Sequence, residues 1–279
     1  MHKTTLDASM MMHVSMSLLD EVEVIAREAG AAIMGVYARK FSVIEKQDHS
    51  PLTEADAAAQ EIIASRLQQL QPTLPILSEE AVGDFSGADN QGRYWLADPL
   101  DGTKEFIQRN GEFTVNIALI ENGRSILGVV YAPALNIAWL AADGSGAFKI
   151  EAEGKRISIR VAEHADGKIW RVVGSRSHAG NSLTKFLQQL GPHELLPMGS
   201  SLKFCLVAEG NADVYPRLGP TSLWDTAAAQ CVVEQAGGGV IQLTGKPLSY
   251  LNPSAVLNPF FVVHGKSTVN WAELVRGSR

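Results

Sequence analysis

The stretch RYWLADPLDGTKEF, residues 93–106, places an apolar run before two aspartates, Asp98 and Asp101, and a threonine, Thr103. An apolar run that ends at Pro and Gly is typical of a buried strand followed by a tight turn. Two neighbouring carboxylates repel each other unless a proton or a cation lies between them, and hard divalent cations prefer oxygen ligands. We therefore expect a cation site at this strand end. A second reading, in which the Asp-Pro and Asp-Gly pairs only form turns, stays open at this point.

The residues around the two aspartates favour a site for an anion held by a metal. The Leu100 carbonyl lies between them in the sequence and offers a further oxygen ligand. Gly102 permits close approach of the backbone, and the helix-like TKEFIQ that follows is expected to aim its first N–H groups at an anion. The loop therefore has the features of a binding site for a metal-bound phosphate.

The overall composition limits the class of protein. The chain has 279 residues, of which 46% are hydrophobic and 19% charged, with a formal net charge of -6. These values predict a globular protein with a large core and argue against broad binding to a nucleic acid polymer, which needs a basic surface. Cys205 and Cys231 are too few for a disulfide framework or a thiolate metal site, so we expect core residues and a reducing cytoplasm. No apolar run approaches the roughly 20 residues of a transmembrane helix.

Periodicity predicts two helices and a large sheet in the first part of the chain. The helices span 17–40, with Ser17 as the cap, and about 53–70, with Thr53 near the start. A short strand follows in LPILSEE, and further strands are expected in RYWLAD, in FTVNIALIENGRSILGVVYAP and in NIAWLAADGSGAFKI. Asn-Gly and Asp-Gly turns join them, which favours hairpins and a mainly antiparallel sheet.

The second part of the chain alternates between strand and helix patterns. WRVVGS and ADVYPRL have the pattern of strands, whereas SLTKFLQQL, SSLKFCLVAEG and WDTAAAQCVVEQAGG have that of helices. The fold class is therefore α/β (α+β). We expect a flexible N-terminal extension over 1–16, an α+β half over 17–165 and an α/β half over 166–279 that completes the site.

Further acids lie where predicted elements begin or end. Glu79 and Glu80 follow a short strand, and Asp225 opens a helix rich in small residues. Taken singly, the glutamates suit a solvated loop and the aspartate complements a helix dipole. Because all of them lie at element ends, we expect these acids to meet Asp98 and Asp101 at one edge of the molecule.

Three of these motifs together resemble those of a known family. WLADPLDGTKEF, WDTAAAQCVVEQAGG and the acidic pair of LSEE are similar, in the same order, to signatures of the magnesium-dependent, lithium-sensitive phosphatases related to inositol monophosphatase. The resemblance runs from about Ser17 to Val263 and implies a layered αβαβα sugar-phosphatase fold. Lys104 and Glu105 stand where inositol phosphatases usually have Thr-Asn. In this the chain resembles the bacterial 3'(2'),5'-bisphosphate nucleotidases, which convert adenosine 3',5'-bisphosphate to AMP and phosphate.

The resemblance also implies a set of site residues. Thr103 is expected to pair with Glu79 and orient the attacking water, with Asp101 as a third catalytic residue. Asp56 matches a position that binds a further metal through water, although helix capping explains it equally well. About two to three magnesium ions are expected on Glu79, Asp98, the Leu100 carbonyl, Asp101, Asp225 and Asp56. The expected substrate-binding residues are Glu79, Leu100, Asp101, Gly102, Thr103, Ser175, Arg176, Ser177, His178, Lys203, Arg217 and Asp225, with Lys46 near the same pocket.

The chemistry explains why carboxylates are needed here. Phosphate-monoester hydrolysis is among the slowest uncatalysed reactions, and paired metal ions activate a water while they stabilise the leaving oxygen. No side-chain nucleophile is then required. The alternatives are an inositol or sugar monophosphatase on the same scaffold and a non-catalytic cation or nucleotide sensor. The resemblance also implies that 3'-phosphoadenylyl sulfate is a further candidate substrate, and that contact with the cytoplasmic side of the inner membrane is an alternative to a purely cytoplasmic location.

Overall fold

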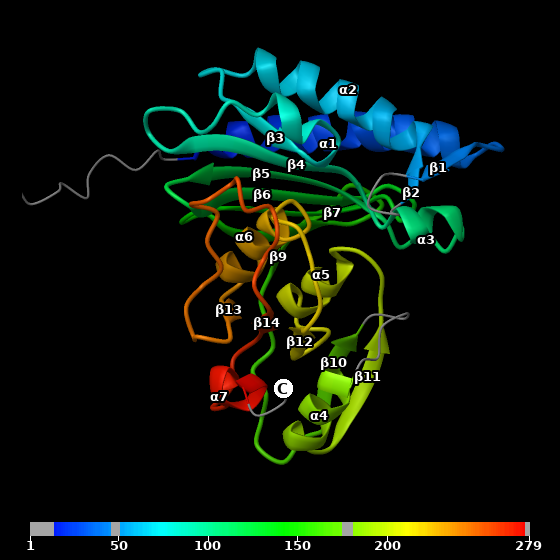
Figure 1. Cartoon of the computed structure of the whole chain (residues 1–279). Helices are drawn as coiled ribbons and strands as arrows, with labels where there is room; N and C mark the ends of the chain where they lie inside the picture. The colour runs from blue at the N-terminus through cyan, green and yellow to red at the C-terminus, as the bar shows by residue number, and fades with distance from the viewer. Residues whose placement is uncertain (1–13, 46–50, 175–180, 277–279) are drawn as a thin grey trace, which may run out of the picture.

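The computed structural model describes residues 14–45, 51–174 and 181–276. Within these ranges the helices and sheets form five layers (Figure 1). Two long helices cover a seven-stranded sheet, a pair of helices lies beneath it, a five-stranded sheet follows, and two short helices close the far side. The αβαβα arrangement expected from the family resemblance is confirmed.

The first layer consists of α1 (Met16–Tyr37) and α2 (Glu54–Gln69). The N-cap of α1 is Ser15, whose hydroxyl accepts a hydrogen bond from the Leu18 N–H, so the prediction of Ser17 was wrong by two residues. Val14 is 1% exposed and belongs to the core. Residues 14–16, the last of the expected extension, belong to the described ranges, and Met16 also packs against this core; residues 1–13 lie outside them. Thr53 caps α2 as expected.

The large sheet carries most of the site and is antiparallel except between its first two strands. Its order follows the chain: β3 (Ile76–Ser78), β4 (Arg93–Asp101), β5 (Thr114–Glu121), β6 (Arg124–Ala132), β7 (Ile137–Ala142), β8 (Gly146–Ile150) and β9 (Arg156–Ile159). The mainly antiparallel sheet predicted from the hairpin turns is confirmed.

Both faces of this sheet are buried. Trp95 and Ala97 of β4 pack toward α1 and α2, whereas Tyr94 and Leu96 pack toward the helices of the middle layer. Since successive strand residues point to opposite faces, a strand buried on both sides has a continuous apolar sequence. Asp98 shares the parity of Tyr94 and Leu96, so it faces the middle layer rather than α1 and α2.

The second part of the chain forms the remaining three layers. The five-stranded sheet has the order β11 (His193–Pro197), β10 (Trp170–Gly174), β12 (Val214–Arg217), β14 (Phe261–His264) and β13 (Gly239–Gln242). The middle layer is α5 (Leu202–Ala208) and α6 (Ala227–Gln235), and the outer layer is α4 (Asn181–Leu190) and α7 (Trp271–Arg276). Three smaller elements complete the described fold: an antiparallel pair of β1 (Val43–Glu45) and β2 (Pro51–Thr53), the 3-10 helix η1 (Glu79–Asp84), and α3 (Thr103–Ile107).

A glycine brings the middle layer onto the large sheet. A Cβ atom at Gly128 of β6 would lie 2.1 Å from the Ala228 carbonyl oxygen in α6, which no side chain tolerates. This close approach fixes the distance between α6 and the large sheet. Asp225 lies just before the first residue of that helix. No helix among the described residues has the combined length and apolar character that crossing a bilayer requires.

Candidate metal centre and substrate pocket

Three carboxylates from separate elements meet at one edge of the large sheet. Glu79 is the first residue of η1, Asp98 lies within β4, and Asp225 precedes the first residue of α6 by two positions. One oxygen atom of each lies within 4.8 Å of the others. Asp225 was predicted to open the helix; it instead lies in the turn that leads into it. The expectation that acids at element ends converge is confirmed for these three residues.

Burial makes this cluster of charges unfavourable on its own. Desolvation raises the pKa of Asp98 well above its ordinary value, and the charges of Glu79, Asp101 and Asp225 raise it further. A hydrogen bond of 3.0 Å from the Leu100 N–H to Asp98 Oδ1 opposes this shift only in part. Desolvation likewise raises the pKa of Asp225 to about 8, with Asp101 as the next cause.

Asp101 belongs to the same electrostatic group but is held by different contacts. A β-bulge separates Asp98 from Asp101 along the ladder with β5. Asp101 Oδ2 accepts hydrogen bonds from the backbone N–H and the hydroxyl of Ser201, at 2.5 and 2.7 Å. The Ser201 hydroxyl also lies 2.9 Å from the Asp225 carbonyl oxygen and accepts from Asn116 Nδ2 at 2.8 Å. Ser201 thus joins a carboxylate of the large sheet to the turn that carries Asp225.

The donor set fits a hard divalent cation. Neither Asp98 nor Asp225 forms an ion pair with a described lysine, arginine or histidine, although Asp98 is 1% exposed. Buried carboxylates without a cationic partner are costly, and a bound cation removes that cost. An oxygen-only ligand set excludes the softer metals that prefer thiolate.

The loop after β4 places two further predicted residues beside the cluster. Gly102 has φ +94°, and a Cβ atom there would lie 3.0 Å from the Glu112 carbonyl oxygen, so only glycine suits this position. The Thr103 hydroxyl lies 3.3 Å from the Leu100 carbonyl oxygen and 3.4 Å from Asp56 Oδ1. The pairing of Thr103 with Glu79 stays a prediction.

Asp56 has an observed structural role. Its Oδ2 accepts hydrogen bonds from the N–H and the hydroxyl of Thr53, at 2.7 and 2.8 Å, and closes the capping box of α2. The residue is 1% exposed, and Thr103 lies beside its other oxygen. The capping alternative is therefore confirmed, and the role of Asp56 toward a further metal stays a prediction.

A pocket with two cationic side chains, one buried and one partly buried, adjoins the carboxylates. It is lined by Asp101 and Asp225 and also by Lys203 of α5 and Arg217 of β12. Lys203 is 8% exposed, and burial lowers its pKa; Asp101 opposes that shift, whereas Arg217 adds to it. The Nε atom of Arg217 is buried without a hydrogen-bond partner among the described residues. Because two like charges held together in a buried place favour an anion, this pocket suits a phosphate group.

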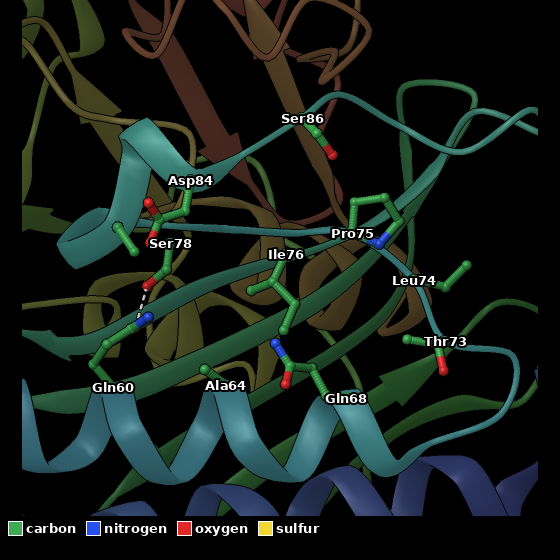
Figure 2. Close-up of a pocket in the computed structure, with 11 residues that line it drawn as sticks. Gln60, Ala64, Gln68, Thr73, Leu74, Pro75, Ile76, Ser78, Asp84 and Ser86 are labelled. Carbon is green, nitrogen blue, oxygen red and sulfur yellow. Dashed lines mark hydrogen bonds between the residues drawn. The ribbon is translucent and has the colours of Figure 1, made fainter.

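A larger cavity, of about 630 Å³, lies elsewhere, between α2 and the free edge of β3 (Figure 2). Gln60, Gln68, Thr73 and Ser78 supply polar groups to its wall, and the Ser78 hydroxyl donates to Gln60 Oε1 at 2.5 Å. None of the three clustered acids, Glu79, Asp98 and Asp225, lines this cavity. We therefore assign the chemistry to the smaller pocket, where carboxylates and cationic side chains occur together.

Comparison with known proteins decides the family. The model of the inositol monophosphatase family matches residues 17–277. The chain belongs to the inositol monophosphatase family. That family is metal-dependent, in agreement with the carboxylate cluster. The resemblance inferred from the three motifs is confirmed.

Individual members of the inositol monophosphatase family cover almost the whole chain. The 3'(2'),5'-bisphosphate nucleotidase CysQ of Escherichia coli O157:H7 is 53% identical over 248 residues, which are 88% of this chain and 99% of the relative. The nucleotidase of the same name from Haemophilus influenzae is 33% identical and covers 95% of this chain and 98% of its own. Among solved structures, CysQ from Bacteroides thetaiotaomicron is 40% identical, with a TM-score of 0.76, and covers 90% of this chain and 98% of its own.

Some expected residues of this family's site lie outside the described residues. These are Lys46, Ser175, Arg176, Ser177 and His178. Conversely, Ser201 and Asn116 were not among the predicted residues, although both contact Asp101, Asn116 at 3.5 Å. The signal for Ser201 was present in GSSLKFC, where it precedes the predicted Lys203 by two positions. Its contact with Asp101, 100 residues away in the chain, cannot be predicted from sequence periodicity.

Replacement of Ser201 with alanine is expected to weaken metal-dependent activity about 10- to 100-fold, the usual effect of losing a group that orients a metal ligand. The reason is that the variant loses the hydroxyl bond to Asp101 and leaves Asn116 Nδ2 without its 2.8 Å partner. We would titrate activity with magnesium and compare Ser254→Ala, which changes an exposed serine. Identical metal titrations for the two variants would contradict a role for Ser201 at the metal centre.

Proposed function

We propose that this protein is a magnesium-dependent 3'(2'),5'-bisphosphate nucleotidase that hydrolyses adenosine 3',5'-bisphosphate to AMP and phosphate. The observation that carries the proposal is that buried Lys203 and partly buried Arg217 line a single pocket together with the carboxylates Asp101 and Asp225. The relatives named as nucleotidases, at up to 53% identity over most of the chain, support the same activity. 3'-Phosphoadenylyl sulfate is a second candidate substrate of the same pocket.

The charges of the pocket match a substrate with two phosphates. A phosphate monoester at the reacting end needs metal ions beside Asp98 and Asp225, because carboxylates alone repel it. A second phosphate has no metal of its own and therefore needs fixed positive charges, which Lys203 and Arg217 supply. An inositol monophosphate carries no second phosphate for Lys203 and Arg217 to bind. This difference favours the nucleotidase over the inositol monophosphatase alternative.

Magnesium, when bound, supplies an acidified water and a positive charge for the leaving oxygen. Glu79, Asp98, the Leu100 carbonyl, Asp101 and Asp225 are the ligands that we propose for it. The protein's own residues then orient the reactants. We propose that Thr103, whose hydroxyl lies between the Leu100 carbonyl oxygen and Asp56, forms one hydrogen bond with the attacking water. Gly102 keeps the loop backbone clear of side-chain atoms where the phosphate approaches.

A covalent thiol mechanism is disfavoured by the position of both cysteines. Cys205 and Cys231 are each 1% exposed, and burial raises the pKa of both thiols well above their ordinary value. A thiol in that state is a poor nucleophile, so the two residues act as small core side chains. Two free, buried cysteines also agree with the proposed location in a reducing cytoplasm.

The proposal is tested by the substrate and metal dependence of purified protein. We expect phosphate release from adenosine 3',5'-bisphosphate in magnesium, much slower release from inositol 1-phosphate, and neither reaction in excess chelator. Faster hydrolysis of inositol 1-phosphate would establish the monophosphatase alternative. Nucleotide binding without any phosphate release would instead identify a sensor.

Lithium should inhibit the reaction at millimolar concentration, because family members are typically lithium-sensitive. A small monovalent cation at a carboxylate site supplies less charge to the phosphate than magnesium does. Initial rates would be measured at fixed magnesium with increasing lithium chloride, and with sodium chloride at equal ionic strength as the control. Equal rates in the two salts would be evidence against this expectation.

A further inference from the structure

The segment between β13 and β14 contains the tripeptide Leu-Asn-Pro twice, at residues 251–253 and 257–259. The two asparagines differ in environment. Asn252 is exposed, whereas Asn258 is 8% exposed. A buried carboxamide needs hydrogen-bond partners, so the second copy must have a reason to be buried.

The backbone around Asn258 is paired with the turn that precedes α6. The Asn258 N–H donates to the Thr221 carbonyl oxygen at 2.9 Å, and the Leu223 N–H donates to the Val256 carbonyl oxygen at 2.8 Å. Ser222 forms an isolated antiparallel bridge in the same region. The segment therefore lies directly along the turn that contains Asp225.

The carboxamide of Asn258 adds two donors to this turn. Its Nδ2 atom lies 2.6 Å from the Ser222 carbonyl oxygen and 3.1 Å from Thr226 Oγ1. The Ser222 carbonyl can only accept, which fixes the nitrogen of the amide on that side. These two acceptors stand on either side of Asp225 in the sequence, so one side chain holds both ends of the turn.

Ser222 lies between the Asn258 carboxamide and the Asp225 carboxylate and is hydrogen-bonded to both. Its carbonyl oxygen accepts from Asn258, and its N–H donates to Asp225 Oδ2 at 2.9 Å. A shift of Ser222 therefore moves the group that orients the Asp225 side chain. The contact acts on a ligand rather than on substrate, since Asn258 is not among the residues that line the pocket.

The oxygen atom of the carboxamide has a different environment from the nitrogen. Asn258 Oδ1 is buried without a hydrogen-bond partner among the described residues. Such an atom costs free energy, and an apolar side chain of similar size would avoid that cost. An apolar side chain could not, however, donate to Ser222 and Thr226.

We propose that Asn258 is a positioning residue that holds the turn 222–226 so that Asp225 reaches the metal centre. The inference rests on the proposed function only in taking Asp225 as a metal ligand. This role explains why Asn258, in the second copy of the tripeptide, is buried. Asn252, in the exposed first copy, serves as a control within the same segment.

The first test compares Asn258→Ala with Asn252→Ala. Binding of Mn²⁺ to substrate-free protein would be followed by electron paramagnetic resonance of the free ion, together with the magnesium concentration for half-maximal activity. We expect Asn258→Ala to weaken Mn²⁺ binding and to raise that magnesium concentration by about 10- to 100-fold, the usual range for a residue behind a metal ligand. At saturating magnesium, kcat should fall far less. Asn252→Ala should match the wild type in every measurement.

A purely structural role gives a different result. Asn258→Ala would then lower the unfolding temperature in chelator while Mn²⁺ affinity stayed that of the wild type, and this outcome overturns the proposal. The Mn²⁺ measurement needs no substrate, so it remains decisive even if the wild type proves to hydrolyse a substrate other than the nucleotide.

A second variant, Asn258→Asp, separates position from charge and keeps the volume of the side chain. A carboxylate this close to a cation site would tighten metal binding if charge alone mattered. If position matters, loss of the donor and repulsion of the Ser222 carbonyl should weaken Mn²⁺ binding in spite of the added charge. Tighter binding by Asn258→Asp would overturn the proposal.

Discussion

Asp98→Asn is expected to abolish most of the hydrolysis and, at the same time, to stabilise the metal-free protein. Activity should fall by about 10²- to 10³-fold or more, the scale for losing one group that acts on transition-state charge. Stability should rise because desolvation and three neighbouring carboxylates raise the pKa of Asp98, so its ionised form opposes folding. The metal-free variant should therefore unfold at a higher temperature than the metal-free wild type.

The direction of the pH effect follows from the same shift. A carboxyl group with a raised pKa in the folded state binds its proton more tightly there than in the unfolded chain. The contribution of Asp98 to the stability of the metal-free wild type is therefore present below the ordinary value of 3.8 and is lost as the pH rises through the raised value. Asp98→Asn should flatten this part of the stability profile.

Thermal unfolding in chelator and turnover at saturating magnesium would be measured for Asp98→Asn and for Asp84→Asn. Asp84 is exposed on the wall of the larger cavity, so its replacement makes the same change in charge away from the cluster. Turnover near that of the wild type in Asp98→Asn would refute its assignment as a ligand. A lower unfolding temperature would refute the electrostatic argument.

Lys203→Ala is expected to reduce kcat/KM for adenosine 3',5'-bisphosphate by about 1.5 to 3 kcal/mol, or roughly 10- to 150-fold, the usual strength of a hydrogen bond to a charged group. The buried ammonium group of Lys203 shares a pocket with Arg217 and is proposed to hold the phosphate that does not react. Binding energy from a remote group also positions the reacting group, so kcat should fall together with apparent affinity.

The decisive comparison is with a small monophosphate that lacks the second phosphate. Its hydrolysis should change little in Lys203→Ala. Lys246→Ala removes an exposed lysine from the segment between β13 and β14. This variant controls for the change in net charge. Equal losses on both substrates would place Lys203 in the metal centre or the fold, and the argument for a second phosphate site would fail.

The carboxylates of the site were predictable because each has a local signature. Asp98 follows an apolar run, Glu79 follows a short strand, and Asp225 precedes a helix of small residues. Such signatures describe where an element ends, and element ends collect at the edges of sheets. Ser201 and Asn258 have no such signature. Their partners lie 100 and 36 residues away, and a hydroxyl or carboxamide in a loop is common without a role.

The strands of the smaller sheet show a related limit. β11 was not predicted because its residues, His193–Pro197, are mostly exposed and carry no alternation of polar and apolar side chains. It pairs in parallel with β10 at the sheet edge, where backbone hydrogen bonds rather than burial hold it. Periodicity detects burial, so an edge strand with little burial escapes it.

The origin of the three clustered carboxylates has a consequence for assembly of the protein. Glu79 lies in η1 and Asp98 in β4 of the large sheet, whereas Asp225 lies in the turn before α6, and Ser201 links that turn to Asp101. With Glu79, Asp98 and Asp225 as the proposed ligands, neither part of the chain alone supplies the whole set. High-affinity metal uptake can therefore begin only after the two sheets have docked, and it then opposes their separation. A chain that ended before residue 225 would lack Asp225 and would leave exposed the face of the large sheet that α6 covers, so it should not bind the metal with the affinity of the whole chain.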